Sequence, residues 1–125
     1  MPHTLYPSSI GALSDAHKRL TPELHEAFQN FSRKVFAEGA LAIKTKQLIA
    51  VAVAHVTQCP YCIRSHTRAA MRDGATREEL LEAIWVAAEM RAGAAYTHSA
   101  LALNVMEEAA SPDGADRTIA RNPAG

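Results

Sequence analysis

The chain has 125 residues, and its 13 basic and 13 acidic side chains give a formal net charge of zero. This length suits one domain, and 48% hydrophobic against 21% charged residues is typical of a globular protein rather than a disordered one. Since the sequence has no long basic run, the charge pattern gives no support to binding of nucleic acid or of an anionic membrane.

The N-terminal part of the chain shows no charged lead followed by an apolar run, so we do not expect a signal peptide. The most apolar stretch, residues 48–56, is too short to cross a bilayer. We therefore expect a soluble cytoplasmic protein, in which thiols stay reduced unless they are catalytic. Residues 1–13, rich in Pro, Ser and Gly, are expected to form a flexible arm, and a short helical turn is expected from the N-cap residue Ser14.

Two helices are predicted before the cysteines. Thr21 followed by Pro22 is a strong helix start, and the apolar stripe behind it ends near Glu38. The next helix covers about residues 43–57 and is apolar on all sides between 48 and 54, which is typical of a buried helix.

A third helix is predicted to begin at the cysteine pair. With Cys59 as N-cap, Pro60 takes the first helical position, where its missing N–H costs nothing. Cys62 then lies in the first turn, and His66 lies one turn further along the same face. We expect this helix to end at Gly74.

A capping box of Thr76 and Glu79 predicts the start of a fourth helix. Gly93 is expected to break or kink it, and a last helix is predicted over about residues 94–109. His98 lies on an apolar face of that helix and is expected to be a core histidine.

The fold class predicted from these elements is all-α: a compact multi-helix bundle in one domain over residues 1–125, with its core over about 20–108. Residues 111–125 are expected to form a flexible tail. Several helices are apolar over more than one face, which exceeds what one small bundle can bury. We therefore expect a homo-oligomer.

The cysteine pair has three interpretations. In the redox interpretation, the helix N-terminus stabilises a Cys62 thiolate, His66 takes or relays the thiol proton, and Cys59 closes a disulfide with oxidised Cys62. In the metal interpretation, His55 joins these residues in H-x3-C-x2-C-x3-H, a set of four zinc ligands. In the third, both cysteines are buried as small apolar residues. A c-type haem is excluded because Ile63, not His, follows the second cysteine.

Two motifs stand out in KTKQLIAVAVAHVTQCPYCIRSHTRAAMRDGATREELLEAIWVAAEM: C-x-Y-C-x-x-x-H and G-A-T-x-E-E-L. In them, and over about residues 20–108, the chain resembles the carboxymuconolactone decarboxylase-like family in its alkyl hydroperoxidase D-like branch. The resemblance implies an all-helical trimer or hexamer that reduces peroxides, or exchanges disulfides, through its cysteine pair. The decarboxylases that name the family lack this pair, so their lactone chemistry is not expected.

Carried over to this chain, the resemblance makes Cys62 the attacking thiol, Cys59 the resolving thiol and His66 the proton relay. The branch commonly has Glu where this chain has Gln47, and Gln can orient a group but cannot exchange a proton near neutral pH. We expect Gln47 or His55, two turns further on, to assist His66. A helix-end role for His55, bonding the last carbonyls, is an equal alternative.

The sequence thus predicts a thiol peroxidase or disulfide exchanger with no cofactor and no resident metal. Its partners would be a small hydroperoxide and a dithiol reductant, lipoyl-type or thioredoxin-like. The alternatives are a non-enzymatic zinc-binding or structural oligomer, and a redox sensor without peroxidase turnover.

Overall fold

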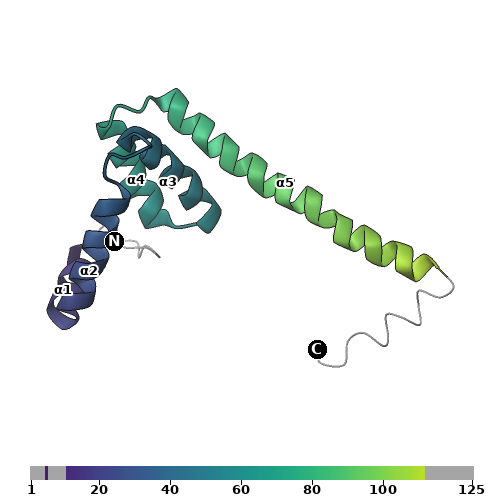
Figure 1. The fold of residues 1–125 in the computed structure, drawn as a ribbon, viewed down its shortest axis with the longest axis horizontal. Coiled ribbons are helices and arrows are strands. Elements are labelled where there is room, and N and C mark those ends of the chain that lie inside the picture. The colour runs from purple at the N-terminus through teal and green to yellow at the C-terminus, as the bar shows by residue number, and fades with distance from the viewer. Residues whose placement is uncertain (1–4, 6–10, 112–125) are drawn as a thin grey trace. The chain divides into compact units, whose positions relative to one another are not determined.

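The computed structural model of the protein describes residue 5 and residues 11–111. All regular structure in these residues is helical, which confirms the predicted all-α class (Figure 1). The helices are α1 (Gly11–Leu20), α2 (Pro22–Val35), α3 (Ile43–Thr57), α4 (Pro60–Arg72) and α5 (Arg77–Ala110). Within the described part of the chain, none of them combines the length and apolarity that crossing a membrane requires.

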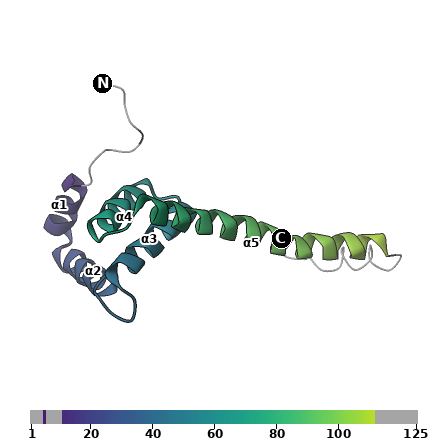
Figure 2. The same ribbon diagram turned by 90° about the horizontal axis from the view of Figure 1, so that it is seen from above.

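The chain divides into two compact units, Met1–Ala87 and Ala88–Gly125, and the boundary falls inside α5. In the first unit, α3 packs on α4 and α1 packs on α2 (Figure 2). The second unit contains the rest of α5. The single domain expected over the whole chain stays a prediction. Most of the expected arm, 1–13, and tail, 111–125, lies outside the described residues.

The buried centre of the first unit consists of Val51, Ala70 and Leu80, one each from α3, α4 and α5. Leu48 and Ile84 pack against this centre and are partly buried. Burial of these aliphatic groups is what joins the three helices, because removal of apolar surface from water is the main favourable term in packing. The helix that carries the cysteines is thereby held on both α3 and the start of α5.

Helix α3 is buried on one face only, so the prediction of burial on all sides is wrong. Val51 and Ala54 are 0% and 2% exposed, whereas Ile49 and Val53 are 47% and 51% exposed. The apolar pattern has no preferred side, so it could not show which face meets the core. The uncovered face borders a cavity described below.

The connection from α2 to α3 is fixed by two charged side chains. Helix α2 ends at Val35, three residues before the predicted end at Glu38. The Lys46 ammonium donates to the carbonyls of Val35 and Ala37, at 2.8 and 2.6 Å. The carboxylate of Glu38 accepts the Ile43 N–H at 2.8 Å. Each charge satisfies backbone groups that a helix end leaves unpaired, and each has the sign that the helix dipole favours.

We expect Lys46→Met to lower the free energy of unfolding by about 1–3 kcal/mol, because two carbonyls lose a charged donor. Lys44→Met is the matched control, since Lys44 lies in the same turn but forms an exposed ion pair with Glu79 at 3.0 Å. Urea denaturation would measure both variants. Equal losses in the two variants would contradict the capping role of Lys46.

The start of α5 confirms the predicted capping box. Thr76 N–H donates to the Glu79 carboxylate at 2.9 Å, and Glu79 N–H donates to the Thr76 hydroxyl at 3.1 Å. The first of these bonds, with the ion pair to Lys44, holds the pKa of Glu79 below its usual value. The Glu79 side chain is therefore ionised at neutral pH and can accept the Thr76 N–H.

Three predictions about helix bounds and burial are wrong. Helix α1 begins at Gly11, before the expected cap Ser14. Helix α5 continues through Gly93, because a glycine inside a helix costs only about 1 kcal/mol and its neighbours are good helix formers. His98 is exposed rather than buried in the core.

Candidate redox site at the start of helix α4

The cysteine pair lies at a sharp junction between α3 and α4. Gln58 ends α3 in the left-handed conformation, with φ of 58°, and Cys59 N–H donates to the Ala54 carbonyl at 3.2 Å. This conformation is more often adopted by Gly or Asn and it turns the chain out of the helix. Cys59 is then extended, and Pro60 opens α4 as predicted.

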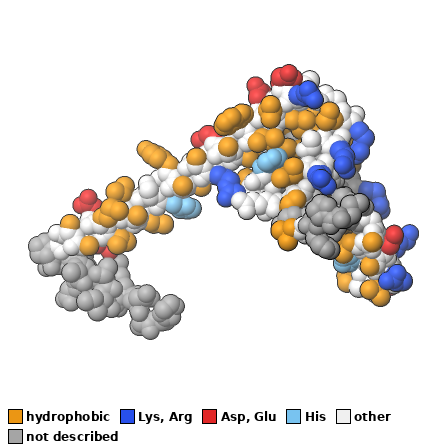
Figure 3. Space-filling view, turned by 180° about the vertical axis from the view of Figure 1, so that it is seen from behind, with side chains coloured by type: hydrophobic (Ala, Val, Ile, Leu, Met, Phe, Trp, Pro, Cys, Tyr) orange, Lys and Arg blue, Asp and Glu red, His pale blue; other side chains and the backbone are white. Residues whose placement is uncertain are grey.

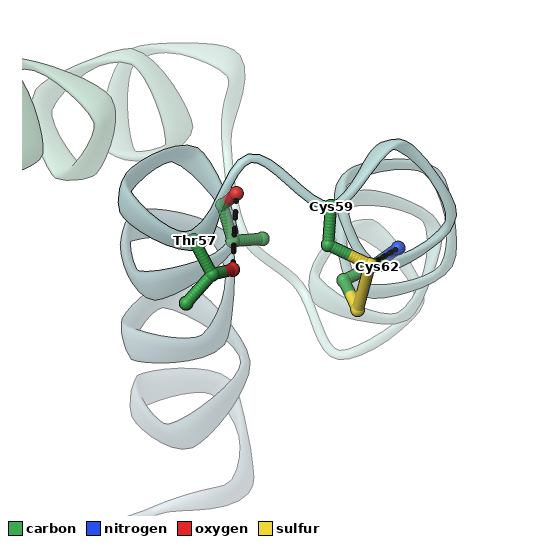
Figure 4. The surroundings of a disulfide bond; sticks show 4 residues. Thr57, Cys59 and Cys62 are labelled. Carbon is green, nitrogen blue, oxygen red and sulfur yellow. Dashed lines mark hydrogen bonds between the residues drawn. A yellow bond between two sulfur atoms is a disulfide. The ribbon is translucent and has the colours of Figure 1, made fainter.

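Cys59 and Cys62 are joined by a disulfide bond (Figure 4). Their Cα atoms are 5.2 Å apart, a usual separation for bonded cysteines. Cys59 is the N-cap of α4, and its sulfur accepts the Cys62 N–H at 3.2 Å. When the bond is reduced, this N–H favours a thiolate at Cys59. The helix dipole favours negative charge on either sulfur, because both lie at the helix N-terminus.

His66 is bonded to Gln47 across the interface of α3 and α4, with 2.7 Å between Nδ1 and Oε1. Gln47 is only 7% exposed, the one buried polar side chain among the described residues. Because an amide oxygen can only accept, the His66 Nδ1 carries the proton, and Nε2 of the neutral ring has the lone pair. Gln47 therefore selects the tautomer in which Nε2 can act as a base.

Burial lowers the pKa of His66 from its usual value of 6.5. Desolvation penalises the charged imidazolium, so the neutral ring persists to a lower pH than in an exposed histidine. The ring also stacks on Phe36, with centroids 5.0 Å apart and an interplanar angle of 28°. This stacking leaves no local sign in the sequence, because Phe36 and His66 are thirty positions apart and meet only through tertiary packing.

A cavity of about 480 Å³, the apolar hollow, lies between the end of α2, α3 and α4. On the α3 side it is lined by Ile49, Ala50, Val53 and Ala54. Cys62 and His66 are also part of its lining. A small molecule in this cavity would therefore lie against the second cysteine and the histidine together.

A second cavity of about 470 Å³, the α2–α4 groove, also reaches Cys62 and His66. It is lined on its α2 side by Phe28, Gln29, Phe31 and Ser32, and on its α4 side by Tyr61 and Ser65. Val35 and Phe36 line both cavities, as do Cys62 and His66. Cys62 and His66 are thus lining residues of two cavities.

His55 is placed differently from the other predicted site residues. Its Nδ1 lies 2.7 Å from the Val51 carbonyl of its own helix, the contact expected of a helix-end histidine. It is not among the lining residues of either cavity. Within the described residues no group of three or more His, Cys, Asp or Glu side chains is placed to hold a metal, so the four ligands of the zinc alternative are not brought together.

Comparison with known proteins gives a family match. The model of the carboxymuconolactone decarboxylase family matches residues 22–105. The protein named "uncharacterized protein 4 in cox locus" of Paracoccus denitrificans is 57% identical over 102 residues, which is 82% of this chain and 91% of that protein.

Two solved structures have the same fold. A carboxymuconolactone decarboxylase family protein from Legionella pneumophila, crystallised in its apo form, is 38% identical with a TM-score of 0.64. The match covers 79% of this chain and 88% of that one. A protein from Methanobacterium thermoautotrophicum is 40% identical with a TM-score of 0.63, over 66% of this chain and 93% of that one.

Proposed function

This chain belongs to the carboxymuconolactone decarboxylase family, and we propose that it is a thiol oxidoreductase of alkyl hydroperoxidase D type. It reduces peroxides, or exchanges disulfides, through Cys59 and Cys62. The observation that carries the proposal is the Cys59–Cys62 bond at a helix N-terminus, beside a histidine that is hydrogen-bonded to a buried glutamine. A pair that only packed in a core would need neither feature.

In the oxidising half-reaction, the Cys62 thiol gives its proton to Nε2 of His66 and its thiolate attacks the terminal oxygen of a hydroperoxide. The O–O bond breaks, Cys62 becomes a sulfenic acid, and the leaving alkoxide takes the proton from His66 to form an alcohol. Cys59 then attacks the Cys62 sulfur, and water leaves as the disulfide forms.

Gln47 is a positioning residue in this scheme. It holds the Nδ1 proton of His66 in place across the helix interface, at 2.7 Å. Because Gln cannot take that proton, His66 carries one proton at Nε2 and passes it directly to the leaving group.

An external dithiol, lipoyl-type or thioredoxin-like, completes the cycle by reducing the disulfide. The test is steady-state consumption of cumene hydroperoxide by the purified protein with dihydrolipoamide as reductant. Continuous turnover supports a peroxidase or exchanger. Oxidation that stops after one equivalent per cysteine pair would instead indicate a redox sensor. This second candidate is favoured by Gln47, because its amide cannot relay a proton.

Replacing Gln47 by Glu is expected to shift the pH dependence of Cys62 oxidation. Below the pKa of His66 the ring is protonated and cannot act as a base, and this pKa lies under 6.5 in the native protein. A carboxylate at Nδ1 stabilises the imidazolium and so raises that pKa. The acid limb of the rate profile should therefore move to higher pH, as stopped-flow measurement from pH 5 to 9 would show.

The same substitution should raise the plateau rate at pH 8 by about tenfold, because the carboxylate strengthens Nε2 as a base. Gln47→Leu is the control, since it removes the hydrogen bond without adding a charge. It should slow the reaction and leave the acid limb below pH 6.5. An unchanged profile in the Glu variant would contradict the role given to Gln47.

We further propose that the protein is a homo-oligomer, a trimer or a hexamer. In the second unit α5 leaves Tyr96, Leu101 and Met106 at 81%, 68% and 61% exposure, and hydrophobic side chains follow its length (Figure 3). Apolar surface on this scale is typical of an interface between chains. Light scattering should give three or six times the 13.5 kDa chain mass, and a monomer would contradict the proposal.

A further inference from the structure

The two cavities at Cys62 differ in the chemistry of their walls. Apart from the reacting Cys62 and His66, the polar side chains of the apolar hollow are Lys46 and Thr57. Lys46 donates to two backbone carbonyls, and the Thr57 hydroxyl donates to the carbonyl of Ala54. The rest of the lining is aliphatic or aromatic. This hollow therefore suits an apolar organic group better than a charged or strongly hydrated one.

The α2–α4 groove combines aromatic rings with hydroxyl and amide groups. Gln29, Ser32 and Ser65 line it together with Phe28 and Tyr61. Such a wall can accommodate a flexible arm that has both carbon chain and hydrogen-bonding groups. The groove and the apolar hollow meet at the residues that line both, and the stacked rings of Phe36 and His66 are the largest of these.

We propose, resting on the redox function above, that the oxidant and the reductant reach Cys62 from opposite sides of the Phe36–His66 pair. The apolar hollow binds the organic group of a hydroperoxide, and the α2–α4 groove admits the dithiol. Both cavities include Cys62 in their lining, and neither includes Cys59. Cys62 is thus the sulfur that each co-substrate meets.

The reducing step follows from this geometry. One thiolate of the dithiol attacks the Cys62 sulfur, the Cys59–Cys62 bond breaks, and Cys59 leaves as a thiolate. The Cys62 N–H, 3.2 Å from the Cys59 sulfur, stabilises that leaving group. The second thiol of the reductant then attacks the mixed disulfide, which releases the Cys62 thiolate and a cyclic disulfide. Two electrons pass to the cysteine pair.

Two matched substitutions test the separation, each adding one ring to one cavity. Val53 lines only the apolar hollow and Ser65 lines only the α2–α4 groove, and both are exposed enough to accept Phe. Val53→Phe should slow oxidation of the reduced protein by cumene hydroperoxide by about tenfold, and leave reduction of the disulfide by dihydrolipoamide unchanged. Ser65→Phe should have the reverse effect. Thiol titration after rapid quenching measures each half-reaction separately.

Equal slowing of both half-reactions by either variant would overturn the proposal, as would an exchange of the two effects. Failure of the peroxidase function is distinguishable, because then the wild-type protein is not oxidised at all. In that event reduction by dihydrolipoamide and calorimetric binding of cumyl alcohol still decide the matter. For the two-sided arrangement to stand, Ser65→Phe must slow only the reduction by dihydrolipoamide. Val53→Phe must weaken only the binding of cumyl alcohol.

Discussion

Cys62→Ser is expected to abolish peroxide consumption, with a loss of more than about 10³-fold. Cys62 supplies the attacking sulfur, and a serine hydroxyl is not ionised at neutral pH and cannot pass through a sulfenic acid. The measurement is the steady-state rate with cumene hydroperoxide and dihydrolipoamide. Full activity in this variant would show that Cys62 is not the attacking thiol.

Cys59→Ser is the matched variant, and it should behave differently. Serine is a favourable N-cap, so its hydroxyl can accept the Cys62 N–H that the Cys59 sulfur accepts in the native protein. The helix start is retained while the resolving thiol is lost. We expect Cys62 to be oxidised once, to a sulfenic acid that dimedone traps, and then not to form the internal disulfide. Normal turnover in this variant would contradict the resolving role of Cys59.

His66→Gln is expected to slow oxidation of Cys62 at pH 7 by about 10²–10⁴-fold, the usual contribution of a positioned general base. The amide can still donate to Gln47, but it cannot take the thiol proton. The acid limb of the rate profile, which belongs to the buried imidazole with its lowered pKa, should disappear. Stopped-flow oxidation with cumene hydroperoxide measures both the rate and its pH dependence.

His55→Gln serves as the control for this experiment. His55 is also a partly buried histidine near the cysteines, but its Nδ1 contacts the Val51 carbonyl of α3. Its loss should change the oxidation rate little and leave the acid limb in place. If His55→Gln instead matches the loss in His66→Gln, His55 acts in the proton relay and the assignment to the Gln47–His66 pair is incomplete.

Local features of the site could be predicted from the sequence because they depend on neighbouring residues. The N-cap at Cys59, the proline behind it and the capping box of Thr76 and Glu79 all use groups within three residues of each other. The spacing of Cys62 and His66 likewise placed them on one face of α4. Helix α5 shows the limit of such reasoning, since Gly93 weakens a helix without ending it.

Features that join distant parts of the chain could not be predicted in the same way. The Gln47–His66 bond spans nineteen positions, and its existence depends on the packing of α3 against α4. The two carbonyl contacts of Lys46 and the stacking of Phe36 on His66 have the same origin. Side-chain polarity suggested that Gln47 orients another group, but only the fold identifies that group as the Nδ1 of His66.

The most direct test of the redox assignment is a count of free thiols in the reduced protein, before and after about one equivalent of cumene hydroperoxide. We predict that both thiols of the chain disappear together and that dihydrolipoamide restores both. Two thiols that survive the peroxide, or that become countable only after a chelator is added, would contradict it.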